Sequence, residues 1–197
     1  MSKVGPDIRL RLLDALHEAI IHPGIVRIQA AIDMFRAAGP DVVDAVVQTI
    51  SLILEKGGVL KNHTKHHPAL IEGCLEILGG MRYYRSLPLL LDATHPKFGQ
   101  FINARAIWAI GDVLSYPGNE RYRDFNGITQ VLTYALSDLS LSVRRAAIHT
   151  IAVAKLTEFE EDIAPLTSDT SDLRDWARWC FASWRGDNFI NEPPNLM

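Results

Sequence analysis

Cysteine is scarce in this chain and no hydrophobic run is long. Only two of the 197 residues are cysteines, too few for a disulfide framework. The longest apolar stretches fall far short of the roughly 20 residues that cross a bilayer. Neither sign of charge dominates, because 20 basic and 23 acidic residues leave a net charge of −3. That balance disfavours general binding to the phosphate backbone of nucleic acids.

Targeting signals and catalytic motifs are also missing from the sequence. The N-terminus has no apolar core followed by a small-residue cleavage site, so we expect a cytoplasmic protein with free thiols and no membrane segment. The patterns GxxxxGK[ST], GxSxG, HExxH, CxxC and GxGxxG do not occur. We therefore favour a protein with no cofactor and no catalytic residues, although missing motifs alone do not rule out an enzyme.

Helical periodicity, by contrast, runs through almost the whole chain. One stripe with steps of three and four is formed by Val42, Val43, Val46, Val47, Ile50, Ile53 and Leu54. Its β-branched residues alone would favour a strand, but the period and the length predict a helix. Similar stripes occupy 8–21, 25–38, 69–79, 87–94, 101–114, 128–137, 142–154, 160–167 and 172–184. The sequence therefore predicts an all-α fold of nine or ten helices.

The chain also resembles itself at intervals of about 30 to 40 residues. In each copy a small residue precedes a larger apolar residue by one turn: Cys74 and Leu78, Ala106 and Ile110, Ala147 and Ile151, Ala177 and Phe181. Such a unit is long enough for two helices and two turns, and a loop over 115–126 accounts for the longest interval. We expect the small residues to let neighbouring helices approach closely, while the larger ones fill the layer between units.

Two segments carry a family resemblance, LPLLLDATHPKFGQFINARAIWAIGDV (87–113) and LSVRRAAIHTIA (141–152). This pattern resembles the HEAT-repeat family, in the short-repeat form also found in phycobilin lyases. The resemblance is clearer over 69–187 and weaker over 1–68. It implies a right-handed α-solenoid of about five helix pairs, forming a single repeat domain over 1–187 with a tail at 188–197. The second helix of each pair would line the concave face.

Aligned positions of the second helices would then form columns across that face. We predict a binding surface made of Arg105, Trp108, Asp112, Arg145, His149, Trp176 and Trp179. In it, Trp108, His149 and Trp179 share one repeat position. Tryptophan and arginine are frequent in interface hot spots and can also hold a flat conjugated ligand or a cation. An alternative stays open, in which the C-terminal tryptophans cover the apolar core of a terminal repeat.

Two other groups of residues look less like functional sites. A loop carries His63, His66 and His67, but it holds no cysteine or carboxylate that could complete a zinc site, and its lysines oppose a cation. We expect a solvated loop, with a local contact for an acidic partner as the alternative. Cys74 and Cys180 lie on apolar stripes without an activating base nearby, so we expect packed core thiols.

Three functions remain, because repeats of this kind serve unrelated activities. The first is a non-enzymatic module that binds another protein, as adaptors, assembly chaperones and immunity proteins among small bacterial HEAT-like proteins do. The second is a phycobilin lyase-like role, in which the concave residues would contact an open-chain tetrapyrrole. The third is a HEAT-like DNA glycosylase, which would need a local basic patch despite the net charge. That patch would consist of Arg105, Arg144, Arg145, Arg174 and Arg178.

Overall fold

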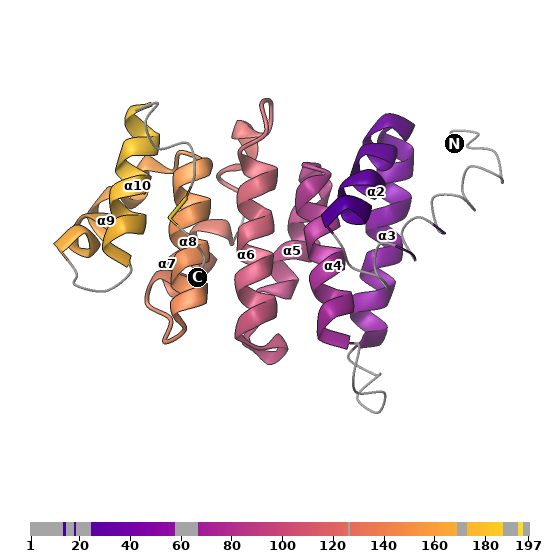
Figure 1. The fold of residues 1–197 in the computed structure, drawn as a ribbon, viewed down its shortest axis with the longest axis horizontal. Coiled ribbons are helices and arrows are strands. Elements are labelled where there is room, and N and C mark those ends of the chain that lie inside the picture. The colour runs from indigo at the N-terminus through magenta and orange to yellow at the C-terminus, as the bar shows by residue number, and fades with distance from the viewer. Residues whose placement is uncertain are drawn as a thin grey trace. The chain divides into compact units, whose positions relative to one another are not determined.

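The computed structural model describes residues 14, 18, 25–57, 67–125, 127–168, 173–186 and 193–194. Within these ranges the regular structure is helical and contains no strand, which confirms the all-α expectation (Figure 1). None of the helices in this part of the chain is both long and apolar enough to cross a membrane. The chain divides into two compact units, Met1–Leu89 (unit 1) and Leu90–Met197 (unit 2). The single repeat domain over 1–187 remains a prediction.

Unit 1 contains the helices α2 (Ile25–Ala38), α3 (Pro40–Gly57) and α4 (His67–Gly80), followed by the short 3-10 helix η1 (Tyr84–Ser86). The helix α2 packs against both α3 and α4. Between α2 and α3, Gly39 adopts a φ of +91°, a left-handed conformation that favours glycine. Pro40 then begins α3, where its missing N–H costs nothing because the first turn has no intrahelical acceptor for it.

The apolar stripe of α3 is helical, as its period predicts, despite its many β-branched residues. Val42, Val43, Val46 and Ile50 of α3 are all buried, and they lie on one helical stripe. Burying this stripe against neighbouring helices outweighs the modest preference of valine and isoleucine for strands. The histidine loop lies outside the described residues over 58–66. His67 begins α4, but its side chain is not described.

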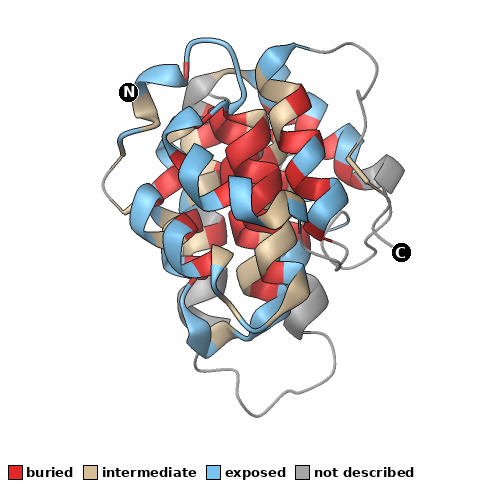
Figure 2. Cartoon of the chain, turned by 90° about the vertical axis from the view of Figure 1, so that its left-hand side faces the viewer, coloured by how far each residue is buried: buried red, intermediate tan, exposed pale blue. Residues whose placement is uncertain are grey.

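Unit 2 contains four longer helices joined by short turns and 3-10 segments. Along the chain, α5 (Leu87–Ala93) spans the boundary between the units and is followed by η2 (Pro96–Phe98), α6 (Gln100–Leu114), η3 (Glu120–Tyr122), α7 (Ile128–Leu136), α8 (Leu141–Val153), η4 (Thr157–Phe159), α9 (Glu160–Ile163), η5 (Ala164–Ser168) and α10 (Leu173–Arg185). The helix α8 contacts α6, α7 and α10 (Figure 1). The buried residues lie where the helices face one another (Figure 2).

One predicted helix is broken in two. The sequence predicts a single helix over 160–167, but α9 ends at Ile163 and a 3-10 turn continues to Ser168. Pro165 lies just after this change. A proline has no backbone N–H to donate to the preceding turn, and its ring crowds that turn. The prediction of one regular α-helix here was therefore wrong.

The small residues of the repeat pattern do permit close helix packing. Ala106, Ala147 and Ala177 are completely or almost completely buried, as is Cys74 in unit 1. In unit 2 the helix α6 approaches α8 so closely that a Cβ on Gly111 would lie 2.8 Å from the Oγ1 atom of Thr150. These burial values confirm the prediction that aligned small residues face the packed layer.

Candidate functional site

The predicted binding residues of α6 lie on its solvent-facing side. Arg105, Trp108 and Asp112 are half-buried and follow one another at spacings of three and four, while the opposite side of the helix is buried. Phe101 begins the same stripe, one turn before Arg105, and is 78% exposed. This α6 stripe (Phe101, Arg105, Trp108 and Asp112) therefore combines two aromatic rings with one charge of each sign.

The three residues that share a repeat position form a continuous ring stack. The rings of Trp108 and His149 are 3.5 Å apart between centroids and tilted by only 12°. The rings of His149 and Trp179 are 5.6 Å apart and tilted by 10°. These residues come from α6, α8 and α10, and their ring contacts agree with the shared repeat position that the alignment gives them.

Trp176 completes the cluster from the side. Its ring meets Trp108 edge-on at 6.0 Å with an interplanar angle of 77°, and it meets Trp179 at 5.9 Å with an angle of 74°. Edge-to-face pairs of this kind contribute about 0.5–1.5 kcal/mol each beyond the area they bury. The aromatic cluster (Trp108, His149, Trp176 and Trp179) therefore joins three helices of unit 2.

Burial of this cluster corrects the expectation of a largely exposed surface. His149 is 7% exposed, Trp176 1% and Trp179 5%, whereas Trp108 is half-buried. The physical reason is the stack itself, because each ring covers a face of its neighbour and Trp176 closes the edge. For Trp176 and Trp179, the burial agrees with the alternative in which they cover apolar core.

The electrostatics of the cluster follow from the burial of His149. Its Nδ1 atom is buried and has no hydrogen-bond partner among the described residues. Burial lowers the pKa of His149 from 6.5 to about 3, since the charged imidazolium would lose its hydration. The ring is therefore neutral at physiological pH, and it acts as a stacking partner and not as a cation or a general acid.

Two charged residues lie within about one helical turn of the half-buried Trp108. Arg105 and Asp112 flank it on α6, and Arg145 of α8 is likewise half-buried. In the expected basic patch, Arg174 and Arg178 are exposed, and the Nε atom of Arg174 lies 3.6 Å from a carboxylate oxygen of Asp175.

Both cysteines are buried, and burial suppresses their ionisation. Burial raises the pKa of both Cys74 and Cys180 to about 12, which agrees with packed core thiols and disfavours a thiolate nucleophile. In the part of the chain that the structure describes, no three histidine, cysteine, aspartate or glutamate side chains come together as a metal site. His63 and His66 lie outside the described residues.

Phe101 is the surface residue that sequence reasoning missed. Its signal was available, because it lies seven residues, or two helical turns, before Trp108 on the same stripe. Repeat alignment does not indicate Phe101, since its counterpart on α8 is Ser142, which is not aromatic.

Comparison with known proteins finds no matching family model and no significantly similar curated protein.

Proposed function

We propose that the chain is a non-enzymatic protein-binding module of the HEAT-repeat kind, working as an adaptor, an assembly chaperone or an immunity-type protein. In this proposal the helices form a right-handed α-solenoid of about five pairs, with the α6 stripe on the concave face. The supporting observation is the α6 stripe, where an exposed Phe101 and a half-buried Trp108 flank Arg105.

Trp108 is suited to an interface because its conformation is fixed before a partner arrives. The ring of His149 covers one face of the Trp108 ring, with 3.5 Å between the ring centroids, and the ring of Trp176 meets the Trp108 ring edge-on. Ordering a flexible side chain on binding costs about 0.5–1.5 kcal/mol, and a ring already held in place avoids most of that cost. Tryptophan and arginine are the residue types enriched in interface hot spots, and both occur on the α6 stripe.

The proposal is tested by affinity capture with the tagged full-length chain, comparing the unaltered protein with Phe101→Ala and Trp108→Ala. Tyr134→Ala is the matched control, since Tyr134 is an aromatic residue of α7 that is 67% exposed. We expect a protein that binds the unaltered chain and the control to be lost from both α6 variants. With the purified partner, each α6 variant should raise Kd by at least about 30-fold, equivalent to about 2 kcal/mol.

Folding is controlled within the same set of variants. Phe101 is largely exposed, so Phe101→Ala should leave the urea midpoint unchanged, and a loss of binding then reflects the surface. If every captured protein binds all four chains equally, the α6 stripe is not the interface. A shifted visible spectrum on adding an open-chain tetrapyrrole would favour the lyase-like alternative instead. Retardation of DNA at low salt would favour the glycosylase alternative.

A further inference from the structure

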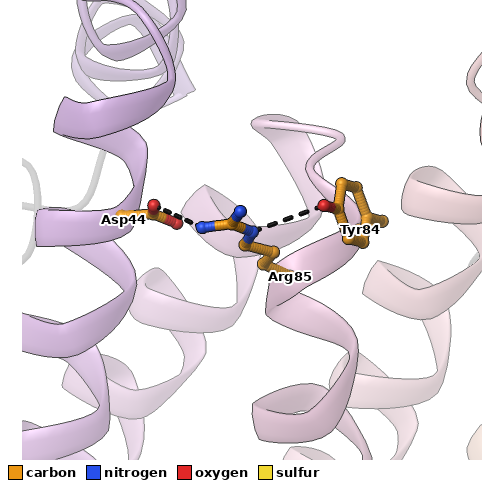
Figure 3. Close-up of polar contacts among 3 residues, drawn as sticks. All are labelled: Asp44, Tyr84 and Arg85. Atoms are coloured by element: carbon orange, nitrogen blue, oxygen red, sulfur yellow. Dashed lines mark hydrogen bonds and ion pairs between the residues drawn. The ribbon is translucent and has the colours of Figure 1, made fainter.

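The surface of α7 carries almost no charge. Charged residues make up 22% of the chain, but the segment 127–143 contains only one, Asp138. A helix at the surface normally exposes charged residues on the side that faces away from the core, and unit 1 does so where Arg85 pairs with Asp44 of α3 at 2.7 Å (Figure 3). The exposed side chains of α7 and of the turn after it form what we call the α7 face: Thr129, Gln130, Thr133, Tyr134, Ser137 and Leu139.

Several polar side chains of this face use their hydrogen bonds within the chain itself. The hydroxyl of Thr133 donates to the carbonyl oxygen of Thr129 at 2.9 Å, and that of Ser137 donates to a carbonyl oxygen of the preceding turn at 3.1 Å. In the following turn, Oδ1 of Asp138 accepts from the backbone N–H of Ser140 at 2.7 Å. These bonds persist when water is displaced, so covering this face costs less free energy than covering polar groups that depend on water.

Two apolar side chains project from the α7 face. Tyr134 is 67% exposed, and Leu139, in the turn five residues later, is 100% exposed. The hydrogen bond between Asp138 and Ser140 holds the backbone on either side of Leu139 before any contact forms. Low charge together with an exposed tyrosine is the composition found at the centre of protein–protein interfaces.

The α7 face is compatible with a second copy of itself. In a two-fold dimer both copies contribute the same residues, so a face with a surplus of one charge would bring like charges together. The α7 face has no such surplus. If two α7 helices pack antiparallel and are centred at the level of Leu132, Gln130 of each copy lies opposite Tyr134 of the other. An amide oxygen can then accept from a phenol hydroxyl at both symmetric positions.

We propose that the α7 face joins two copies of this chain in an antiparallel, two-fold dimer. Leu139 of each copy would lie near the N-terminal end of the other α7. A different protein would find no surplus of charge on this face to recognise. Since α7 has nine residues, the face is only about 14 Å long, which falls short of a standard interface of about 800 Å² per partner. We therefore expect a weak dimer that forms as the protein concentration rises.

The test is sedimentation equilibrium of the full-length chain at concentrations from about 5 µM to about 500 µM, because a weak dimer populates by mass action. The average mass should rise from 22.0 kDa towards twice that value. Leu139→Glu places a carboxylate in an apolar contact and Tyr134→Ala removes the aromatic ring, so each should raise the Kd of the dimer at least about ten-fold. Added salt should not weaken the dimer, since no ion pair holds it.

Met34→Glu is the matched control, because Met34 of α2 is also an exposed apolar residue, with 40% of its surface accessible. This variant introduces the same charge at a different surface and should dimerise like the unaltered chain. Far-UV circular dichroism and urea midpoints verify that all variants fold. Leu139 and Tyr134 are exposed, so their substitution removes no core contact.

Three results would overturn the proposal. The chain stays at 22.0 kDa over the whole concentration range, or Leu139→Glu dimerises as tightly as Met34→Glu does, or salt dissociates the dimer and so places the contact on a charged surface. The proposal does not depend on the α6 stripe. Tyr134→Ala should lose the dimer but still bind the protein captured by the α6 stripe, so failure at one surface is distinguishable from failure at the other.

Discussion

Burial of His149 between two tryptophans makes the stability of unit 2 depend on pH. Burial lowers the pKa of His149 from 6.5 to about 3, whereas the unfolded chain ionises this residue near 6.5. Between these two values the unfolded chain binds a proton that the folded chain does not. Above about pH 6.5, His149 is neutral in both states and does not lower the free energy of unfolding. As the solution is acidified from about pH 6.5 towards pH 3, protonation of His149 in the unfolded chain lowers that free energy progressively.

The expected size of the effect follows from the two pKa values. Lowering the pH by one unit within that window lowers the free energy of unfolding by about 1.4 kcal/mol, because one unit of pKa difference corresponds to that free energy. Acidification from about pH 7.5 to about pH 4.5 should therefore remove about 2.5 kcal/mol through this residue alone. That is a large part of the total stability of an ordinary domain.

The assay is urea denaturation followed by tryptophan fluorescence at these two pH values, for the unaltered chain and for His149→Phe. Phenylalanine keeps a flat ring between Trp108 and Trp179 but cannot ionise. Carboxylates titrate in both proteins, so their contribution cancels in the comparison. With a slope of about 2 kcal/mol per molar urea, the midpoint of the unaltered chain should fall by about 1 M more than that of the variant.

An equal fall of the two midpoints would refute this reasoning. It would mean that His149 accepts a proton in the folded chain without cost, which is incompatible with a ring buried in the aromatic cluster. A larger fall in the variant would contradict the sign of the effect.

Three further predictions concern packing in the core. Trp176→Ala should lower the free energy of unfolding by about 3–5 kcal/mol in urea denaturation, because the ring is almost fully buried. Gly111→Ala should lower it by about 1–3 kcal/mol, despite alanine's higher helix propensity, since the new methyl group would meet Thr150 at 2.8 Å; an unchanged or raised urea midpoint would contradict the close approach of α6 and α8. Cys74 and Cys180 should react with a thiol reagent at about pH 8 only after unfolding in urea, because burial raises both pKa values to about 12, and rapid reaction of the folded chain would disagree with the packing.

The helices could be read from the sequence because their signals are local. The spacing of Val42, Val46 and Ile50 predicts the buried stripe of α3. A proline explains the one predicted helix that the structure contradicts. Pro165 interrupts the predicted helix over 160–167, and its effect on the backbone outweighed the apolar period around it.

The repeat alignment adds information about residues on different helices. It placed Trp108, His149 and Trp179 at one repeat position, and the structure shows that their rings stack. This worked because successive similar helices that pack side by side bring equivalent positions together.

By itself, the sequence determined the helical class, most helix boundaries and the pairing of aligned residues, since all three depend on spacing along the chain. Only the tertiary structure decided which of those residues contact solvent. Trp176 and Trp179 are buried while Phe101 is exposed, because exposure depends on how neighbouring rings cover one another in space. The pairing of Arg85 with Asp44, 41 residues apart, was likewise beyond the sequence. No repeat or period links those two positions, and only the packing of unit 1 brings them together.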